Sequence, residues 1–158
     1  MPLTKYLTIL FISMVPVIEL RGAVPIGIGM GLDPIATIVV CVVGNMIPVP
    51  FIHIFARKLL QWGAKQKLIG KICNFMIHKG AKASAKLSSR TRRHGVMIAL
   101  MLFVGIPLPG TGAWTGTLGA SFLNLDLKTT SFAVMAGVVI AGTIMAIITT
   151  WGLHIFGL

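Results

Sequence analysis

The chain has 158 residues, of which 56% are apolar and only 11% are charged, well below the roughly 25% charged share of a soluble domain. It contains just three carboxylates, Glu19, Asp33 and Asp126. This composition leaves too little polar surface for a water-soluble protein of this size. It excludes an ordinary soluble domain and predicts a single, all-α integral membrane domain over residues 1–158.

The net charge of +11 is typical of nucleic-acid-binding proteins, but its distribution argues against a nucleic-acid partner. Eleven of the 14 Lys and Arg residues fall between Arg57 and Arg93, a stretch without a single acid. Because cytoplasmic loops of membrane proteins are rich in Lys and Arg, segment 57–94 is predicted to be cytoplasmic. We expect a multi-pass protein of a prokaryotic plasma membrane, whose residues 57–93 contact anionic lipid headgroups.

Two of the four apolar blocks predict plain membrane-spanning helices. The blocks cover residues 6–31, 34–56, 95–123 and 131–157. The second has 23 residues, or about 34 Å of helix, which is enough for a hydrocarbon core of about 30 Å. Asp33 followed by Pro34 predicts a helix start, and Asp126 predicts a similar start for the last helix. Pro48 and Pro50 are predicted to break or bend the second block near its cytoplasmic end.

The first and third blocks each carry a break rich in proline and glycine, at residues 16–25 and 105–112. The first break also holds Glu19 and Arg21, each of which would cost at least about 2.5–3.5 kcal/mol on a lipid-facing helix. Irregular backbone at membrane depth is tolerated only where protein buries it or a wet cavity adjoins it. Two helices of roughly ten residues reach about 15 Å, half of the bilayer. Both blocks are therefore predicted to be re-entrant hairpins.

The two halves of the chain resemble each other in the order of hairpin, acid and helix. Four matches carry the likeness: Gly22-Ala23 and Gly29 recur ninety residues later as Gly112-Ala113 and Gly119, and Asp33 and Gly44 recur ninety-three residues later as Asp126 and Gly137. One hairpin plus one span crosses the membrane once, so the second half starts on the opposite side. This predicts inverted repeats at 1–56 and 95–158, with a binding site at their interface. Four full spans would instead give two halves of the same orientation.

The segment between the repeats, residues 57–94, is predicted to contain an amphipathic helix lying on the inner leaflet. Its apolar and polar residues recur at helical spacing on different sides. The apolar side holds Ile69, Ile72, Cys73 and Met76, and the polar side holds Lys67, Lys71, Asn74, His78 and Lys82. A solvated linker helix is the alternative.

Two motifs carry a resemblance to a known family. The first runs from Glu19 through Arg21 and Gly22 to Pro25, and the second runs from Pro107 to Gly116. Together they resemble the signature of the small multidrug export protein family, over nearly the whole chain. That family is similar, more distantly, to the DedA/VTT membrane proteins, which are thought to carry paired re-entrant hairpins. The resemblance implies export, or DedA-like recycling of the carrier lipid undecaprenyl phosphate. The second motif of this chain contains no charged residue.

Glu19 and Arg21 are the leading candidates for a substrate or ion site, because ionisable groups inside a membrane are expensive to keep. Arg21 is suited to bind a phosphate or another anion through paired hydrogen bonds. Glu19 is suited to carry a proton. The alternative is a structural ion pair between the two that holds the hairpin tip together.

The remaining candidates offer hydroxyls, backbone amides and turn-forming residues. A helix start in the second motif could face an anion, or its glycines and prolines simply make the turn. Asn45 either contacts the substrate path or forms an interhelical hydrogen bond, and Trp114 either lines a cavity or packs. The complete candidate set is Glu19, Arg21, Gly22, Pro25, Asn45, Pro107, Pro109, Gly110, Thr111, Gly112, Trp114 and Thr115.

A transporter with its site between the two hairpins, moving a small molecule or an anionic lipid phosphate and coupled to protons, is the main hypothesis. No catalytic carboxylate pair, nucleophile arrangement or metal motif occurs in the sequence, so neither an enzyme nor a cofactor or metal site is expected. A non-transporting structural membrane protein is the third possibility. Four small segments enclose little volume, so we expect a homo-oligomer.

Overall fold

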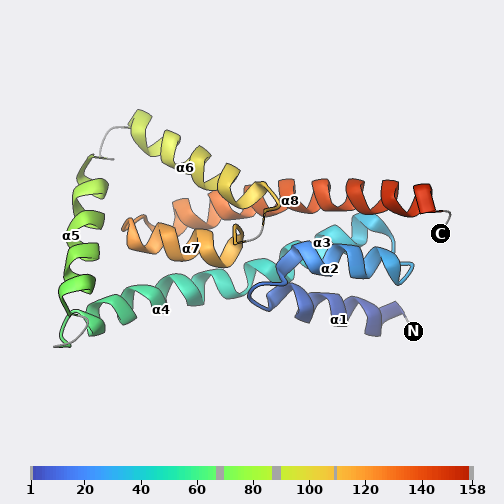
Figure 1. The fold of residues 1–158 in the computed structure, drawn as a ribbon, viewed down its shortest axis with the longest axis horizontal. Helices are drawn as coiled ribbons and strands as arrows, with labels where there is room; N and C mark the ends of the chain where they lie inside the picture. The colour runs from blue at the N-terminus through green and yellow to red at the C-terminus, as the bar shows by residue number, and fades with distance from the viewer. Residues whose placement is uncertain (1, 67–69, 87–89, 109, 157–158) are drawn as a thin grey trace.

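The computed structural model describes residues 2–66, 70–86, 90–108 and 110–156 (Figure 1). All regular secondary structure within these ranges is helical, which confirms the predicted all-α class. The helices are α1 (Pro2–Met14), α2 (Glu19–Gly29), α3 (Pro34–Met46), α4 (Pro48–Gly63), α5 (Gly70–Lys86), α6 (Arg90–Gly105), α7 (Ala113–Phe122) and α8 (Leu127–Phe156).

The first two helices form an antiparallel hairpin whose tip lies near the middle of the molecule (Figure 1). The predicted break through Pro25 is wrong, because Pro25 lies inside α2 and only residues 15–18 interrupt the helices. A proline keeps helical φ and costs the helix one backbone hydrogen bond, so the chain can continue past it. The tip itself is strained, since Val17 and Glu19 have φ of 80° and 49°, a region that non-glycine residues seldom adopt.

The next two helices follow each other along nearly one direction (Figure 1). The predicted helix start is confirmed: the Asp33 side chain accepts a hydrogen bond from the Ala36 amide at 2.8 Å, and Pro34 is the first helical residue. Ile47, between α3 and α4, keeps helical dihedral angles. Residues Pro34–Gly63 are together long and apolar enough to cross a membrane. The interruption at Pro48 therefore lies mid-way along this pair, and the helix extends beyond the predicted end at residue 56.

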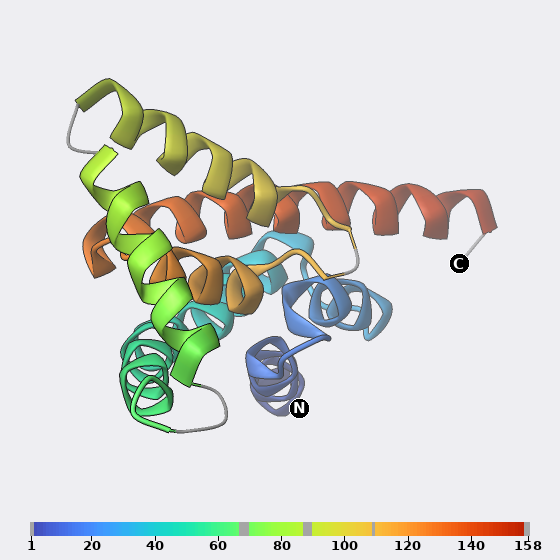
Figure 2. The ribbon, with the colours of Figure 1, turned by 60° about the vertical axis from the view of Figure 1, so that its left-hand side comes forward.

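Helix α5 lies across one end of the molecule, beside α4 and α7 (Figures 1 and 2). The predicted polar side is exposed where it is described, but the predicted apolar side is only partly correct, because Ile72 is 63% exposed. Cys73 and Met76 face the neighbouring helices more closely, and Gly80 is buried. Lys67 and Ile69 lie outside the described residues. The predicted segment 57–94 also includes the end of α4 and the start of α6.

The second hairpin consists of α6 and α7, and the long helix α8 follows it (Figure 1). The irregular stretch between α6 and α7 begins after Gly105 and ends at Gly112, as predicted. The Asp126 carboxylate accepts a hydrogen bond from the Thr129 amide at 3.0 Å, which confirms the predicted start of the last helix. Residues Leu127–Ile155 form the second helix that is long and apolar enough to cross a membrane.

The corner between α2 and α3 has the same backbone pattern as the corner between α7 and α8, ninety-three residues later. The Leu32 amide donates to the Gly27 carbonyl at 3.1 Å, and the Leu125 amide donates to the Ala120 carbonyl at 3.0 Å. Each corner contains a residue with left-handed φ, 76° at Gly31 and 57° at Asn124. A left-handed residue followed by a backbone hydrogen bond is a common helix end.

Two glycines that are ninety-three residues apart both lie at close helix crossings. A Cβ on Gly44 of α3 would lie 2.6 Å from the Leu10 carbonyl of α1, and a Cβ on Gly137 of α8 would lie 2.6 Å from the Met101 carbonyl of α6. The ninety-residue matches are not equivalent in the fold, because Gly22 lies inside α2 whereas Gly112 precedes α7. In a glycine-rich chain, matches of this kind arise without structural equivalence.

The outward faces of the two long helix regions are strongly apolar. Six large side chains there are each 65–77% exposed: Ile35, Phe51, Phe55, Phe132, Trp151 and Ile155. Exposing so much hydrocarbon surface to water is unfavourable, whereas its contact with the acyl chains of a lipid bilayer is favourable.

Candidate functional site

The carboxylate of Glu19 lies against the first turn of α7. Its Oε2 accepts a hydrogen bond from the Ala113 amide at 3.2 Å, and its Oε1 accepts one from the Trp114 amide at 3.1 Å. The first amides of any helix have no partner inside that helix, and together they carry a partial positive charge. The residue that precedes α7 is a glycine, which has no capping side chain. Glu19, only 6% exposed, therefore caps α7 from the other hairpin.

Gly112 makes this contact possible. A Cβ on this residue would lie 2.1 Å from Oε2 of Glu19, closer than any real contact. The connection that contains Gly112 runs beside the start of α2 (Figure 2). A side chain at position 112 would therefore expel the carboxylate from the start of α7.

The guanidinium of Arg21 binds the other broken end of the second hairpin. It donates to the carbonyls of Leu108 and, at 3.2 Å, Ile106, which follow the end of α6, and to the hydroxyl of Thr111 at 2.7 Å. A longer contact of 3.4 Å reaches the Val104 carbonyl inside α6. The carbonyls at a helix end carry partial negative charge. Arg21 thus complements the end of α6 just as Glu19 complements the start of α7.

Glu19 and Arg21 do not form an ion pair with each other, so the structural ion pair that was the alternative to a substrate site is wrong. In the part of the chain that the structure describes, Arg93 and Asp126 are the pair of opposite charges in ion-pair contact. A carboxylate held by the amides of α7 and a guanidinium held by the carbonyls after α6 are each already partnered. The first hairpin therefore supplies both charges to the connection between α6 and α7, whose sequence contains no charged residue.

Trp114 makes a reciprocal contact from the second hairpin to the first. Its indole Nε1 donates to the carbonyl of Met14, the last residue of α1, at 3.2 Å. Each hairpin thus satisfies a helix end in the other. These contacts hold the two tips together by polar bonds, which must break before the tips can separate.

A small cavity adjoins these contacts. It measures about 10 Å³, as space open to the centre of a water-sized sphere, which is just enough for one water molecule. Its walls include Glu19, Arg21, Asn45 and Gly112. The Asn45 side-chain oxygen is buried and lacks a hydrogen-bond partner within the described residues. In this conformation the site is closed to any molecule of drug size.

The structure places the other candidate residues around or outside this cluster. Thr115 is exposed and bonds only to the Gly112 carbonyl, at 3.4 Å. Gly110 is exposed at a φ of 83° that suits glycine. Gly22, Pro25 and Pro107 are half-buried without a polar contact from their side chains. Pro109 lies outside the described residues.

One known protein family matches most of the chain. The model of a family described as "Putative small multi-drug export protein" matches residues 19–144, which include Glu19, Arg21 and all of α7. The chain belongs to this family. No curated protein and no solved structure matches the chain. Membership in the small multidrug export family and the two long apolar helices together indicate a membrane protein with a transport role rather than an enzyme.

One feature of the fold was not predicted from the sequence: a stripe of inward-facing residues along α3 and α4, several of them polar. Every fourth residue of the α3–α4 pair faces the interior, and four of them have a buried polar atom without a partner within the described residues: Thr37, Asn45, His53 and Arg57. Cys41 and Val49 lie between them on the same stripe and are also fully buried. The sequence signal that could have predicted this stripe was the recurrence of polar residues at multiples of four positions along an apolar helix. Buried polar atoms are normally satisfied, so water is expected along this stripe.

His53 belongs to this stripe and is not among the predicted site residues. Its Nδ1 lies 3.0 Å from Oγ of Ser121 on α7, and it is 2% exposed. The Ser121 hydroxyl also lies 2.8 Å from the Thr117 carbonyl, which can only accept. Which of His53 Nδ1 and the Ser121 hydroxyl donates in the contact between them depends on the tautomer of the imidazole ring. No group of three or more metal-binding side chains occurs among the described residues.

Proposed function

We propose that this protein is a membrane exporter in which two re-entrant hairpins meet as inverted repeats and open to bind an anionic group. The observation that carries the proposal is the buried Glu19 carboxylate on the start of α7. A helix start is a ready-made anion site. In the closed conformation, Glu19 occupies that site in place of a substrate.

The lengths of the hairpin helices support the re-entrant arrangement. Helix α1 has 13 residues and α2 has 11, so they are about 20 Å and 17 Å long, short of a hydrocarbon core of about 30 Å. The two tips lie together near the middle of the molecule, and the hairpins point in opposite directions (Figure 1). The repeated corners at a spacing of ninety-three support an inverted repeat. Transporters with such repeats bind at the repeat interface.

The same contacts suggest how protons and substrate are coupled. A proton on Glu19 would remove the negative charge that the amides of α7 hold, and the carboxyl group would then leave more readily. The exposed amides and the guanidinium of Arg21 would form a site for a phosphate or another anionic group. Proton binding and anion binding are thereby linked at one place, since both act on the bond between Glu19 and α7.

The charge distribution sets the orientation that we propose. The end of α4, α5 and the start of α6 lie at one end of the molecule (Figure 1). The positive-inside rule puts this end in the cytoplasm of a prokaryotic cell. A small anion and an anionic lipid phosphate, as in a DedA-like flippase, are both compatible with Arg21.

Thermal unfolding of the purified protein in detergent tests the proposal with three probes: farnesyl phosphate, farnesol and the lipophilic cation ethidium. A ligand that binds only the folded state stabilises it, by about 2.7 kcal/mol at a hundred times its dissociation constant. We expect stabilisation by farnesyl phosphate alone, stronger at pH 5 than at pH 8. Glu19→Gln should bind it equally at both pH values, and Arg21→Ala should lose it.

The control variant is Asp33→Asn, which also removes a carboxylate but lies in an exposed helix cap away from the hairpin tips. It should bind farnesyl phosphate like the unchanged protein. Stabilisation by ethidium that disappears in Glu19→Gln would overturn the anion site and favour export of cationic drugs. Equal stabilisation by farnesol would show that the phosphate is not recognised.

A further inference from the structure

A second hollow region lies where α4, α5 and α7 meet. It consists of two adjoining hollows, and both are lined by Leu60 and Phe122. One measures about 450 Å³ and the other about 200 Å³. Glu19, Arg21 and Asn45 line neither hollow, but Trp114, whose amide binds Glu19, lines the larger one, so this region adjoins the proposed transport site at Trp114.

The larger hollow is an apolar groove. Phe55 and Leu59 of α4, Met76 of α5 and Leu118 of α7 are among the side chains that form its walls, and every residue that lines it is apolar. An open groove of this kind fits a hydrocarbon chain and offers nothing to a polar group.

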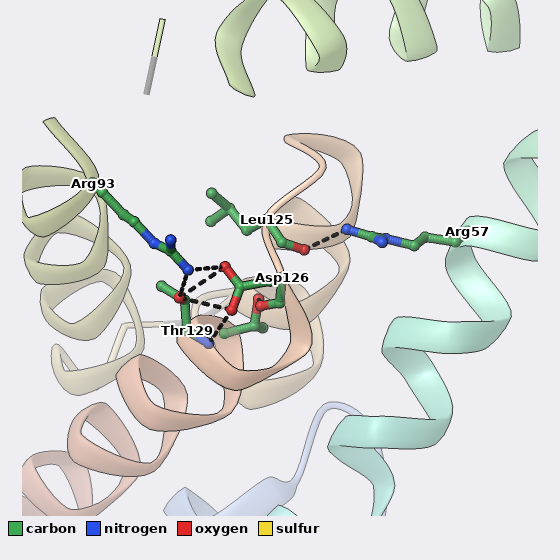
Figure 3. A network of polar contacts seen from close by, with 6 residues as sticks. Arg57, Arg93, Leu125, Asp126 and Thr129 are labelled. Carbon is green, nitrogen blue, oxygen red and sulfur yellow. Dashed lines mark hydrogen bonds and ion pairs between the residues drawn. The ribbon is translucent and has the colours of Figure 1, made fainter. Parts of the chain in front are cut away.

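The smaller hollow contains a cation with free donors. Arg57 donates from Nη2 to the Leu125 carbonyl (Figure 3). Its other two guanidinium nitrogens have no hydrogen-bond partner within the described residues, and Nε is buried. The amides of Gln61 and Asn124 line the same hollow. A guanidinium presents donors in a fixed plane, which suits the oxygens of a phosphate.

No carboxylate competes for Arg57 in the described part of the chain. Neither hollow is lined by an acid. The nearby carboxylate of Asp126 is bound by Arg93 and by the amide and hydroxyl of Thr129 (Figure 3). The charge of Arg57 therefore faces the hollow uncompensated.

We propose that these joined hollows bind one anionic phospholipid, with its phosphate on Arg57 and one acyl chain in the groove between α4 and α7. The position along the helix agrees with this ligand. Residues Pro34–Gly63 form about 45 Å of helix, which exceeds a hydrocarbon core of about 30 Å. The last turns of α4, with Arg57 and Lys58, therefore reach the headgroup layer.

The lipid would also fix the position of α5. Gly80 of α5 packs so closely on the end of α7 that a Cβ there would lie 2.1 Å from the Phe122 carbonyl. Met76, one turn earlier, lines the groove. An acyl chain in the groove contacts α4, α5 and α7 at once. The phosphate contact, at Arg57, involves none of Glu19, Arg21 and Asn45.

Native mass spectrometry of the detergent-purified protein tests the proposal with phosphatidylglycerol, phosphatidylcholine of the same chains, and glycerol phosphate. We expect phosphatidylglycerol to bind more tightly than phosphatidylcholine, and glycerol phosphate not to bind. Arg57→Gln should weaken phosphatidylglycerol binding at least about tenfold, as expected when charge-assisted hydrogen bonds are lost. Lys79→Gln is the matched control. Lys79 is an exposed cation that lies over the ring of Phe75, and Lys79 lines neither hollow.

A second variant keeps the test decisive if Arg57→Gln folds poorly. Leu59→Trp adds bulk to the groove at a side chain that is 51% exposed, and it should weaken binding with Arg57 intact. Equal affinity for the two phospholipids would overturn the proposal. Equal losses in Arg57→Gln and Lys79→Gln would show only diffuse attraction to a basic surface, and tight binding of glycerol phosphate would show a free-phosphate site instead of a lipid site.

Discussion

Glu19 accepts a hydrogen bond from the backbone amide of Ala113 at 3.2 Å, although 94 positions separate the two residues along the chain. This bond joins a charged side chain of the first hairpin to the start of a helix in the second. Together with the bonds of Arg21 to the residues after α6, it makes each broken helix of the second hairpin depend on the first. Stability and the opening of the site that we propose therefore depend on the same few contacts.

Gly112→Ala should displace Glu19 from α7. The new Cβ would lie 2.1 Å from Oε2, so either the carboxylate or the backbone must move, and buried polar groups lose their partners. We expect the free energy of unfolding in mixed detergent–SDS micelles to fall by about 1–3 kcal/mol. Gly119→Ala, inside α7, has nothing within 4 Å of its Cβ and should be stabilising by up to about 1 kcal/mol. Equal effects of the two variants would contradict the proposed role of Gly112.

Arg21→Lys should weaken the hairpin contact although the charge is kept. A lysine ammonium cannot reproduce the planar fork that reaches two carbonyls and a hydroxyl. The hydrogen bond from Arg21 to Thr111, 2.7 Å long, can be isolated by a double-mutant cycle with Thr111→Val. We expect a coupling of about 0.5–3 kcal/mol in the free energy of unfolding. Thr115→Val, at an exposed position, should show no coupling to Arg21→Lys.

Gly44→Ala and Gly137→Ala should destabilise the protein to a similar extent, because the two glycines lie at similarly close helix crossings. Each new Cβ would lie 2.6 Å from a backbone carbonyl of the crossing helix. Overpacking of this kind costs about 1–3 kcal/mol, which unfolding in mixed micelles would measure. Gly29→Ala, whose Cβ meets nothing within 4 Å, is the control. A large cost at one crossing and none at the other would argue against a structural repeat.

The stability of the α7–α8 corner should depend on pH through Asp126. Burial raises the pKa of Asp126, but the hydrogen bonds from Thr129 and the charge of Arg93 together lower it by more than burial raises it. The pKa therefore lies below its ordinary value of 3.8. The ionised carboxylate therefore stabilises the folded state above pH 3.8, and this stabilisation is lost as the pH falls through the lowered pKa. Because the side chain is 47% exposed, the contribution should stay below about 1 kcal/mol.

Unfolding of the unchanged protein and of Asp126→Asn between pH 2 and pH 7 measures this contribution. The difference in unfolding free energy should be constant at neutral pH and vanish toward pH 2. Arg93→Gln should reduce the difference, since it removes one of the causes of the lowered pKa. A difference that does not change over this range would exclude the proposed linkage.

The sequence by itself determined the features that depend on local chemistry. The apolar composition indicated a membrane protein. Asp33 and Asp126 marked helix starts because capping involves only neighbouring residues, and the glycines and prolines after Gly105 marked a break because they act on their own backbone. Glu19 and Arg21 stood out because charge is expensive in an apolar segment.

Only the tertiary structure decided what those charges contact. The bonds from Glu19 to α7 and from Arg21 to Thr111 span 94 and 90 positions, and no local pattern encodes the partner of a side chain at that separation. The position of Pro25 inside α2 and the buried His53 depended likewise on neighbouring helices. A helix end can be satisfied by any suitable group that packing brings to it, and packing is a property of the whole fold.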